Sequence, residues 1–289
     1  MELIGYLLIL LWLVLSSSEG IVVKRYAVRH QSGGMLMNGV ICLFACVFFF
    51  LTDKDGFSMP LELLPYGIAS MLCYAAGFYS MFLAYKYGQF GLTGLLSKLT
   101  LFFPILYGIL VLNEPTSWTI YVGFAVMIAS TLLLVPKEKE NSGKRAFSLK
   151  WLIAVAVTIV SNGFISILTK MQQIRFDNAV SNEFLVLSLG GATIFLLSCG
   201  LITERDTLKE VMKTGIGYGA AAGLFNGAKN LTVIFIYLFV PLSIFSPVSA
   251  CLGTISTYLL ATFLYKEKYT QTQKMGVLLG AIAVVAFAL

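Results

Sequence analysis

The sequence predicts an all-α membrane protein with ten transmembrane helices in two inverted five-helix repeats. The 289 residues are 58% hydrophobic and only 12% charged, and the mean hydropathy is +0.87, which leaves too little polar surface for a soluble domain of this size. Apolar runs of about 18 or more residues, the length that crosses a bilayer, recur along the whole chain. The two halves also repeat the spacing of several landmark residues.

Ten apolar runs mark the expected spans. Backbone polar groups in lipid must form hydrogen bonds within their own segment, so runs of this length are helices. No basic residue precedes the first run, and we therefore expect it to be a retained helix and not a cleaved signal peptide. The expected spans are residues 2–23, 33–52, 60–84, 90–112, 116–135, 149–169, 182–203, 214–237, 241–264 and 272–289.

The longest polar stretch separates the fifth span from the sixth. It reads PKEKENSGKRAFSLK and begins at residue 136. We interpret residues 136–148 as a charged connector between a first five-helix repeat at 1–135 and a second at 149–289. No segment is long enough for a separate soluble domain.

Landmark residues recur with nearly the same spacing in both halves. Tyr66 stands 48 positions before Glu114, and Tyr218 stands 49 positions before Glu267. A single-residue gap therefore aligns spans three to five with spans eight to ten. Each repeat has an odd number of spans, so the second repeat is inverted relative to the first. Inverted repeats around a central site are the plan of many secondary transporters.

The same parallel extends to the ends of the first span of each repeat, where Lys24 and Lys170 occupy corresponding places.

Basic residues also indicate orientation. Connectors after odd-numbered spans carry fifteen Lys and Arg, with Lys24 and Arg25 among them, against three after even-numbered spans. Because cytoplasmic loops are enriched in these residues, we expect a multi-pass protein of the cell membrane with both termini on the extracytoplasmic side. No basic patch on a soluble domain suggests nucleic acid.

The pattern resembles the drug/metabolite transporter superfamily, in its EamA-like branch. The residues that carry the resemblance are Asn113-Glu114-Pro115 with Gly123, and Lys266-Glu267-Lys268 with Gly276. The resemblance covers nearly the whole chain. It implies the ten-helix fold and transport of a small molecule, without naming the substrate. One departure is that Asn113 and Lys266 stand where a Gly commonly precedes the Glu.

Span eight contains the stretch GLFNGAKNLTVIF, in which three polar residues interrupt an apolar helix. Asn226, Lys229 and Asn230 are at positions i, i+3 and i+4 and share one helix face. Small residues lie on an overlapping face and allow a close contact with another helix. These small residues are Gly215, Gly219, Gly223 and Gly227. The contact directs the polar groups into the bundle. Lys229 lies about 21 Å into the membrane by helix rise, where a lysine normally faces a cavity or a partner.

Lys229 is therefore expected to attract an anionic or zwitterionic substrate, with Asn226 and Asn230 orienting its polar atoms. A structural lysine tied to helix-end carbonyls is the alternative. Aromatic walls are expected from the opposing repeat, at Tyr74, Phe78 and Tyr79.

Two further ionisable residues lie inside spans. Lys98 is about 12 Å and Glu19 about 7 Å from the cytoplasmic edge by helix rise, which places Glu19 nearer to Lys98 than to Lys229. A Glu19–Lys98 pair would lower the cost of burying both charges. The sequence leaves open whether such a pair is a static brace or a gate that opens when Glu19 takes up a proton.

The residues favour a secondary transporter that works by alternating access, coupled to protons or to exchange. No GxxxxGK[ST] motif is present, and we expect no cofactor. The five cysteines lie within spans, and the only histidine, His30, lies in a connector, so we expect no metal site. A lipid scramblase or flippase on the same scaffold remains an alternative, since a fold does not fix its cargo. A membrane-embedded lipid-modifying enzyme is disfavoured because a nucleophile–base or metal constellation is missing.

Overall fold

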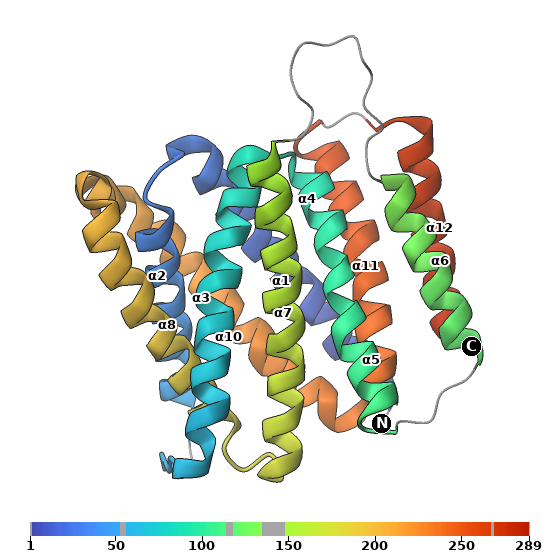
Figure 1. Ribbon diagram of the computed structural model, residues 1–289, viewed down its shortest axis with the longest axis horizontal. Coiled ribbons are helices and arrows are strands. Elements are labelled where there is room, and N and C mark those ends of the chain that lie inside the picture. Colours follow the sequence, from blue (N-terminus) through green and yellow to red (C-terminus); the bar gives the residue numbers. More distant parts are fainter. Residues whose placement is uncertain (1, 53–55, 114–117, 135–147, 267–268, 289) are drawn as a thin grey trace.

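The computed structural model describes residues 2–52, 56–113, 118–134, 148–266 and 269–288, and every regular element among them is a helix. The long helices lie side by side along one direction (Figure 1). We call the end where α1 stops and α7 begins the upper end, and the opposite end the lower end. In Figure 1, α1 begins and α12 ends toward the lower end. This common side agrees with the expectation that both termini face one side of the membrane.

The helices follow the expected order of spans. In the first half they are α1 (Glu2–His30), α2 (Gly34–Thr52), α3 (Leu64–Tyr87), α4 (Phe90–Leu96), α5 (Phe102–Leu110) and α6 (Trp118–Leu134). In the second half they are α7 (Leu149–Arg175), α8 (Ser181–Thr203), α9 (Leu208–Glu210), α10 (Ile216–Phe239), α11 (Leu242–Phe263) and α12 (Gln271–Ala288). Seven helical segments in this described part are long and apolar enough to cross a membrane. The expected all-α membrane fold is confirmed.

Two short irregular segments interrupt this plan. The expected fourth span is α4 and α5 joined by a tight 3-10 turn, η2 (Ser97–Leu101). The short α9 continues into α10 through one π-helical turn, η4 (Val211–Gly215). Such segments change the direction or register of a helix without ending it.

Helix contacts repeat when the two halves are exchanged. Equivalent helices pack on each other in two places, α2 on α8 and α6 on α12. The close pairing of α3 with α7 is matched by that of α1 with α10. The fourth and ninth spans also end alike, because Asn113 and Lys266 both adopt a left-handed backbone, with φ of 50° and 52°. This is the conformation that glycine adopts most easily, which accounts for the Gly expected at both places.

Helix α1 is longer than predicted. The expected span ended at residue 23, whereas the helix continues to His30. Lys24 and Arg25 are therefore helical residues, and assigning them to a connector was wrong. His30 also belongs to the helix. Its ring stacks on Tyr26, with ring centroids 4.7 Å apart.

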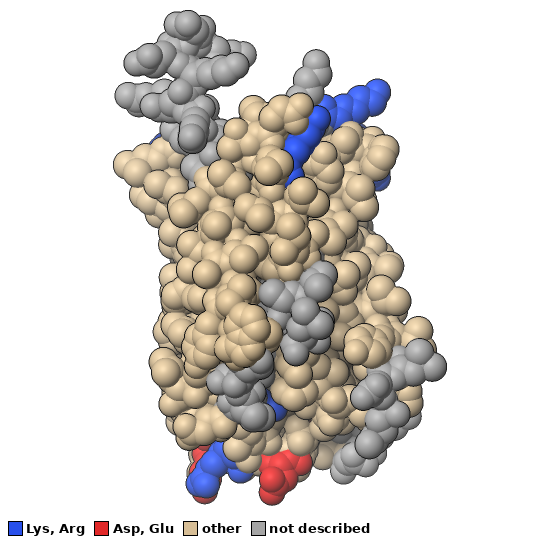
Figure 2. All heavy atoms as spheres, turned by 90° about the vertical axis from the view of Figure 1, so that its right-hand side faces the viewer, with Lys and Arg blue, Asp and Glu red and all other residues tan. Residues whose placement is uncertain are grey.

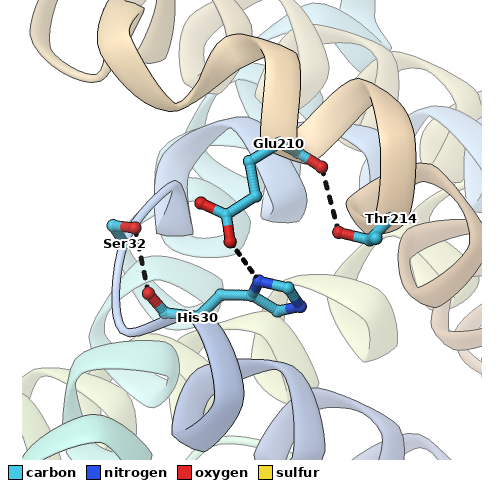
Figure 3. Close-up of polar contacts among 4 residues, drawn as sticks. All are labelled: His30, Ser32, Glu210 and Thr214. Atoms are coloured by element: carbon cyan, nitrogen blue, oxygen red, sulfur yellow. Dashed lines mark hydrogen bonds and ion pairs between the residues drawn. The ribbon is translucent and has the colours of Figure 1, made fainter.

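The upper ends of α1 and α10 are joined by a polar contact. His30 Nδ1 lies 2.5 Å from Glu210 Oε1, at the end of α9. Figure 3 shows this contact, together with the Ser32 and Thr214 hydroxyls that donate to the backbone carbonyls of His30 and Glu210. It holds the start of the α9–α10 segment against the last turn of α1.

The outer surface matches a bilayer. In the view of Figure 2, nearly all visible Lys, Arg, Asp and Glu side chains lie toward the two ends, and uncharged residues form the broad band between them. Large apolar side chains are exposed along the helices, for example Leu10, Val14 and Phe50. Such exposure is costly in water and favourable in lipid.

The glycine face of α10 packs against α2, as predicted. A Cβ atom added at Gly223 would lie 2.6 Å from the Ile41 carbonyl oxygen, and one at Gly227 would meet the Phe48 ring at 2.8 Å. The two backbones therefore approach at glycine distance. This contact fixes the rotation of α10 and turns its polar residues away from lipid.

Candidate functional site

A central cavity of about 320 Å³ lies between the two halves of the chain. Helices α1, α3, α4, α7, α10 and α11 contribute to its walls. Among the lining residues are one carboxylate, one ammonium, several amides and hydroxyls, and several aromatic rings. This mixture of a few polar groups with apolar walls is typical of a small-molecule site.

Four polar residues form a connected network on one wall of this cavity. Lys229 Nζ donates to Glu19 Oε2 at 2.5 Å, and Asn226 Nδ2 donates to Glu19 Oε1 at 2.8 Å. Asn230 Nδ2 then donates to Asn226 Oδ1 at 2.8 Å. Both carboxylate oxygens of Glu19 are thus satisfied by α10.

This network is nearly buried within the bundle. Glu19 is 8% exposed and Asn226 is 2% exposed. The Lys229 side chain retains 21% exposure, toward the cavity. Opposite charges in contact offset part of the cost of removing each from water.

The structure corrects the predicted partner of Glu19. Depth along the helices had placed Glu19 near Lys98, but its carboxylate contacts Lys229 and Asn226. That depth was measured from residue 24, although the helix ends at His30. The side chain of Lys98 lies outside the described residues, so its role as a gating or coupling residue stays a prediction.

The expected aromatic wall is present in part. Tyr74 and Phe78 line the cavity and stack on each other with centroids 5.9 Å apart. Tyr79 does not line it and instead packs beside a core cluster of α2, α3 and α8. The Tyr74 hydroxyl is buried and has no hydrogen-bond partner among the described residues.

Several lining residues were not predicted as site residues. Asn38 on α2 is fully buried, and its Oδ1 has no partner among the described residues. Trp12 and Phe245 line the lower part of the cavity, with ring centroids 5.6 Å apart. Asn38 could have been found from the sequence, because it is an amide in the otherwise apolar helix 34–52. Trp12 and Phe245 could not, because an aromatic residue in an apolar run does not indicate a site.

In the described ranges no three His, Cys, Asp or Glu side chains come together. The thiols of Cys42, Cys46, Cys73 and Cys199 are free.

Comparison with known proteins relates the first half of the chain to a family. Residues 3–135 match the EamA-like transporter family. A solved structure, described only as a crystal structure of a protein, covers 99% of this chain and 97% of its own, with a TM-score of 0.68 and 15% identity. At that identity the likeness shows a shared fold. No curated protein matches the sequence significantly. The first half of this multi-pass membrane protein, residues 3–135, is therefore an EamA-like repeat, and the EamA-like transporter family is part of the drug/metabolite transporter superfamily.

Proposed function

We propose that this transporter moves a small zwitterionic metabolite by alternating access, and that the central cavity is its binding site. The observation that supports this is the contact between Glu19 and Lys229 on the cavity wall. A molecule that carries both a carboxylate and an ammonium group finds the counter-charge for each within one small space. Asn226 and Asn230 add amide groups that orient its polar atoms.

A zwitterion suits this wall better than a simple anion does. The pair has no net charge, so an anion that approached Lys229 would also meet the Glu19 carboxylate about one hydrogen bond away. Like charges at that distance repel strongly where water is scarce. A zwitterion avoids this conflict because its own ammonium group faces Glu19.

The rest of the cavity favours an apolar or aromatic portion in the cargo. Phe78 and Phe245 line it from opposite repeats. The free hydroxyl of Tyr74 offers one hydrogen bond beside the Phe78 ring. Aromatic walls with few oriented polar groups fix the position of a flat or amphipathic molecule.

We further propose that Glu19 couples transport to protons. Protonation removes the carboxylate charge that holds Lys229 and that faces the ammonium group of a bound zwitterion, so proton uptake by Glu19 would drive release of the cargo. Lys98 lies in the 3-10 turn between α4 and α5, where the backbone changes geometry, and it remains a candidate gating residue.

A ligand comparison tests the cargo proposal. Thermal unfolding of the purified protein is measured with phenylalanine, with N-acetylphenylalanine, which lacks the ammonium, and with phenylalanine amide, which lacks the carboxylate. We expect the zwitterion to stabilise the protein by mass action and to bind at least about tenfold more tightly than either analogue, because each loses one charged contact.

A variant away from the cavity controls for the general effect of removing a lysine charge. Lys150 is exposed at the start of α7, so Lys150→Met should leave the order of the three ligands unchanged. Binding of the N-acetyl compound as tight as that of phenylalanine would show an anion site and contradict the zwitterion proposal. Stabilisation by none of the three, in a screen that extends to other zwitterions, would contradict it as well.

A further inference from the structure

Each end of the cavity carries one tyrosine and one lysine, and the two pairs occupy equivalent positions in the two repeats. Tyr85 lies near the end of α3 and Tyr237 near the end of α10, each 19 positions after the repeat landmarks Tyr66 and Tyr218. Both line the cavity. Lys24 Nζ lies 5.8 Å from the centroid of the Tyr85 ring, and Lys170 Nζ lies 5.6 Å from that of Tyr237. Each lysine is thus placed over the equivalent tyrosine.

The two lysines differ in what else they contact. Lys24 is 7% exposed, and its Nζ donates to the carbonyl oxygens of Tyr85 at 3.0 Å and Gly88 at 2.9 Å. These carbonyls end α3. Lys170 is half-buried, and the described residues give it the ring contact but no hydrogen bond.

The same two acceptors exist at the end of α10. Val240 is three positions after Tyr237, as Gly88 is after Tyr85. Both residues cap their helix with the same backbone bond, from Gly88 to Ala84 and from Val240 to Ile236. Carbonyls at a helix C-terminus attract cations through the helix dipole, so the lower end offers Lys170 the site that Lys24 occupies at the upper end.

Helix packing shows the same asymmetry. α1 packs closely against α3, whereas the equivalent helices α7 and α10 have almost no close contact. Aromatic rings line both ends: Tyr85 stacks on Phe90 at 5.4 Å at the upper end, and Trp12 and Tyr237 each meet the Phe245 ring edge-on at 5.6 Å at the lower end. Tyr85 and Phe90 are each only 4% exposed. The two ends therefore differ in helix packing and in the lysine contacts: α1 lies against α3 beside Lys24, whereas α7 and α10 stand apart beside Lys170.

We propose that Lys24 and Lys170 are alternating gate residues. In the present state Lys24 holds the end of α3 against α1 and closes the upper end. In the opposite state Lys170 donates to the carbonyls that end α10 and closes the lower end, while Lys24 releases α3. This inference rests on the alternating-access part of the proposed function and does not depend on which cargo is carried.

An exchange of equivalent contacts suits a transporter energetically. Closing one end and opening the other breaks one lysine–carbonyl contact and makes its counterpart, so the two states stay close in free energy. A cargo or a proton can then shift the population between them. A single lysine at one end would instead bias the protein toward one state.

Side-specific labelling tests this proposal. Ser166 lines the cavity and its hydroxyl bonds only locally to Asn162, so Ser166→Cys serves as a reporter. A membrane-impermeant maleimide is added to either side of vesicles that hold the protein in one orientation and no cargo. The same protein without the reporter gives the background. The quantity compared is the labelling rate from the Lys170 side divided by that from the Lys24 side.

We expect a ratio well above one for the starting protein. Lys24→Met should lower it by about tenfold or more, the change that loss of a charged hydrogen bond produces. Lys170→Met should leave the ratio as high or raise it, and should slow transport because the opposite state loses its contact. Lys86→Met, in the last turn of α3 but outside the cavity lining, is the control and should change nothing.

Opposite effects of the two lysines are the distinctive result. A merely structural lysine, once removed, would loosen the bundle and raise both labelling rates together. Equal shifts in one direction, or no shift in either variant, would overturn the proposal. If Lys24→Met does not fold, Lys170→Met alone still tests the proposal. An unchanged labelling ratio together with unchanged transport would refute the role of Lys170 as a gate residue. The labelling ratio is independent of the ligand comparison, so failure of the zwitterion proposal is recognised separately.

Discussion

Removing the charge of Lys229 should destabilise the protein and also weaken cargo binding. In Lys229→Met the carboxylate of Glu19, whose side chain is 10% exposed, keeps Asn226 but loses its cation. Breaking a buried ion pair by removal of one partner typically costs about 3–5 kcal/mol. Lys229 keeps 21% exposure toward the cavity, so we expect the lower limit, about 3 kcal/mol.

A double variant separates the two effects. Glu19→Gln combined with Lys229→Met removes both charges, and the Gln carbonyl oxygen can still accept from Asn226. Replacing a buried pair by neutral groups is often close to neutral in free energy, so the double variant should recover most of the lost stability. It should not recover binding of a zwitterion, because both counter-charges are gone. Thermal unfolding and ligand affinity are measured on the same preparations.

The exposed pair of Arg175 and Glu62 provides a matched control. Their nitrogen and oxygen are 3.2 Å apart, but the side chains are 62% and 69% exposed. Arg175→Met should therefore cost no more than about 1 kcal/mol. A double variant at Glu19 and Lys229 that stays as unstable as Lys229→Met would refute the unpaired carboxylate as the cause. Normal zwitterion affinity in a folded double variant would refute the pair as the binding site.

Two further predictions concern packing and orientation. Gly223→Leu should destabilise the fold by at least about 1–3 kcal/mol, the usual cost of overpacking, because even its Cβ would meet the Ile41 carbonyl at 2.6 Å. Gly217→Leu, where an added Cβ meets nothing within 4 Å, is the control, and equal unfolding temperatures for the two would contradict the helix contact. Reporters fused at Leu289 and within 138–146 should lie on opposite sides, with 138–146 cytoplasmic. A cytoplasmic signal from Leu289 would reverse the orientation drawn from the basic residues.

The positions of the spans could be predicted because they depend on a local property. A run of apolar residues long enough to cross a bilayer has no other stable conformation in lipid. Interruptions within a span are different, because they depend on neighbours. The 3-10 turn at Ser97–Leu101 lies within an apolar run, and nothing in its composition separates it from a continuous helix.

The site residues that share a face of one helix could be predicted from the sequence, but contacts between two helices could not. Asn226, Lys229 and Asn230 share a face by helical spacing alone, and the glycine contact with α2 sets the direction of that face. Tyr74 and Phe78 were found through the repeat, since they align with Asn226 and Asn230. Tyr79 was misplaced because one further residue, about 100° around the helix, turns its side chain from the cavity to the core beside α8.

The partner of Glu19 was missed because depths on two helices were measured from unequal starting points. With α1 continuing to His30, Glu19 lies 11 residues from the upper end of its helix, or about 16 Å at 1.5 Å per residue. Lys229 lies 13 residues from Ile216 at the start of α10, or about 20 Å. The two depths therefore nearly agree, and the close packing of α1 on α10 brings the side chains together. Helix length, more than side-chain chemistry, thus determines which buried charges meet, because an ion pair forms only between residues at matching heights on adjacent helices.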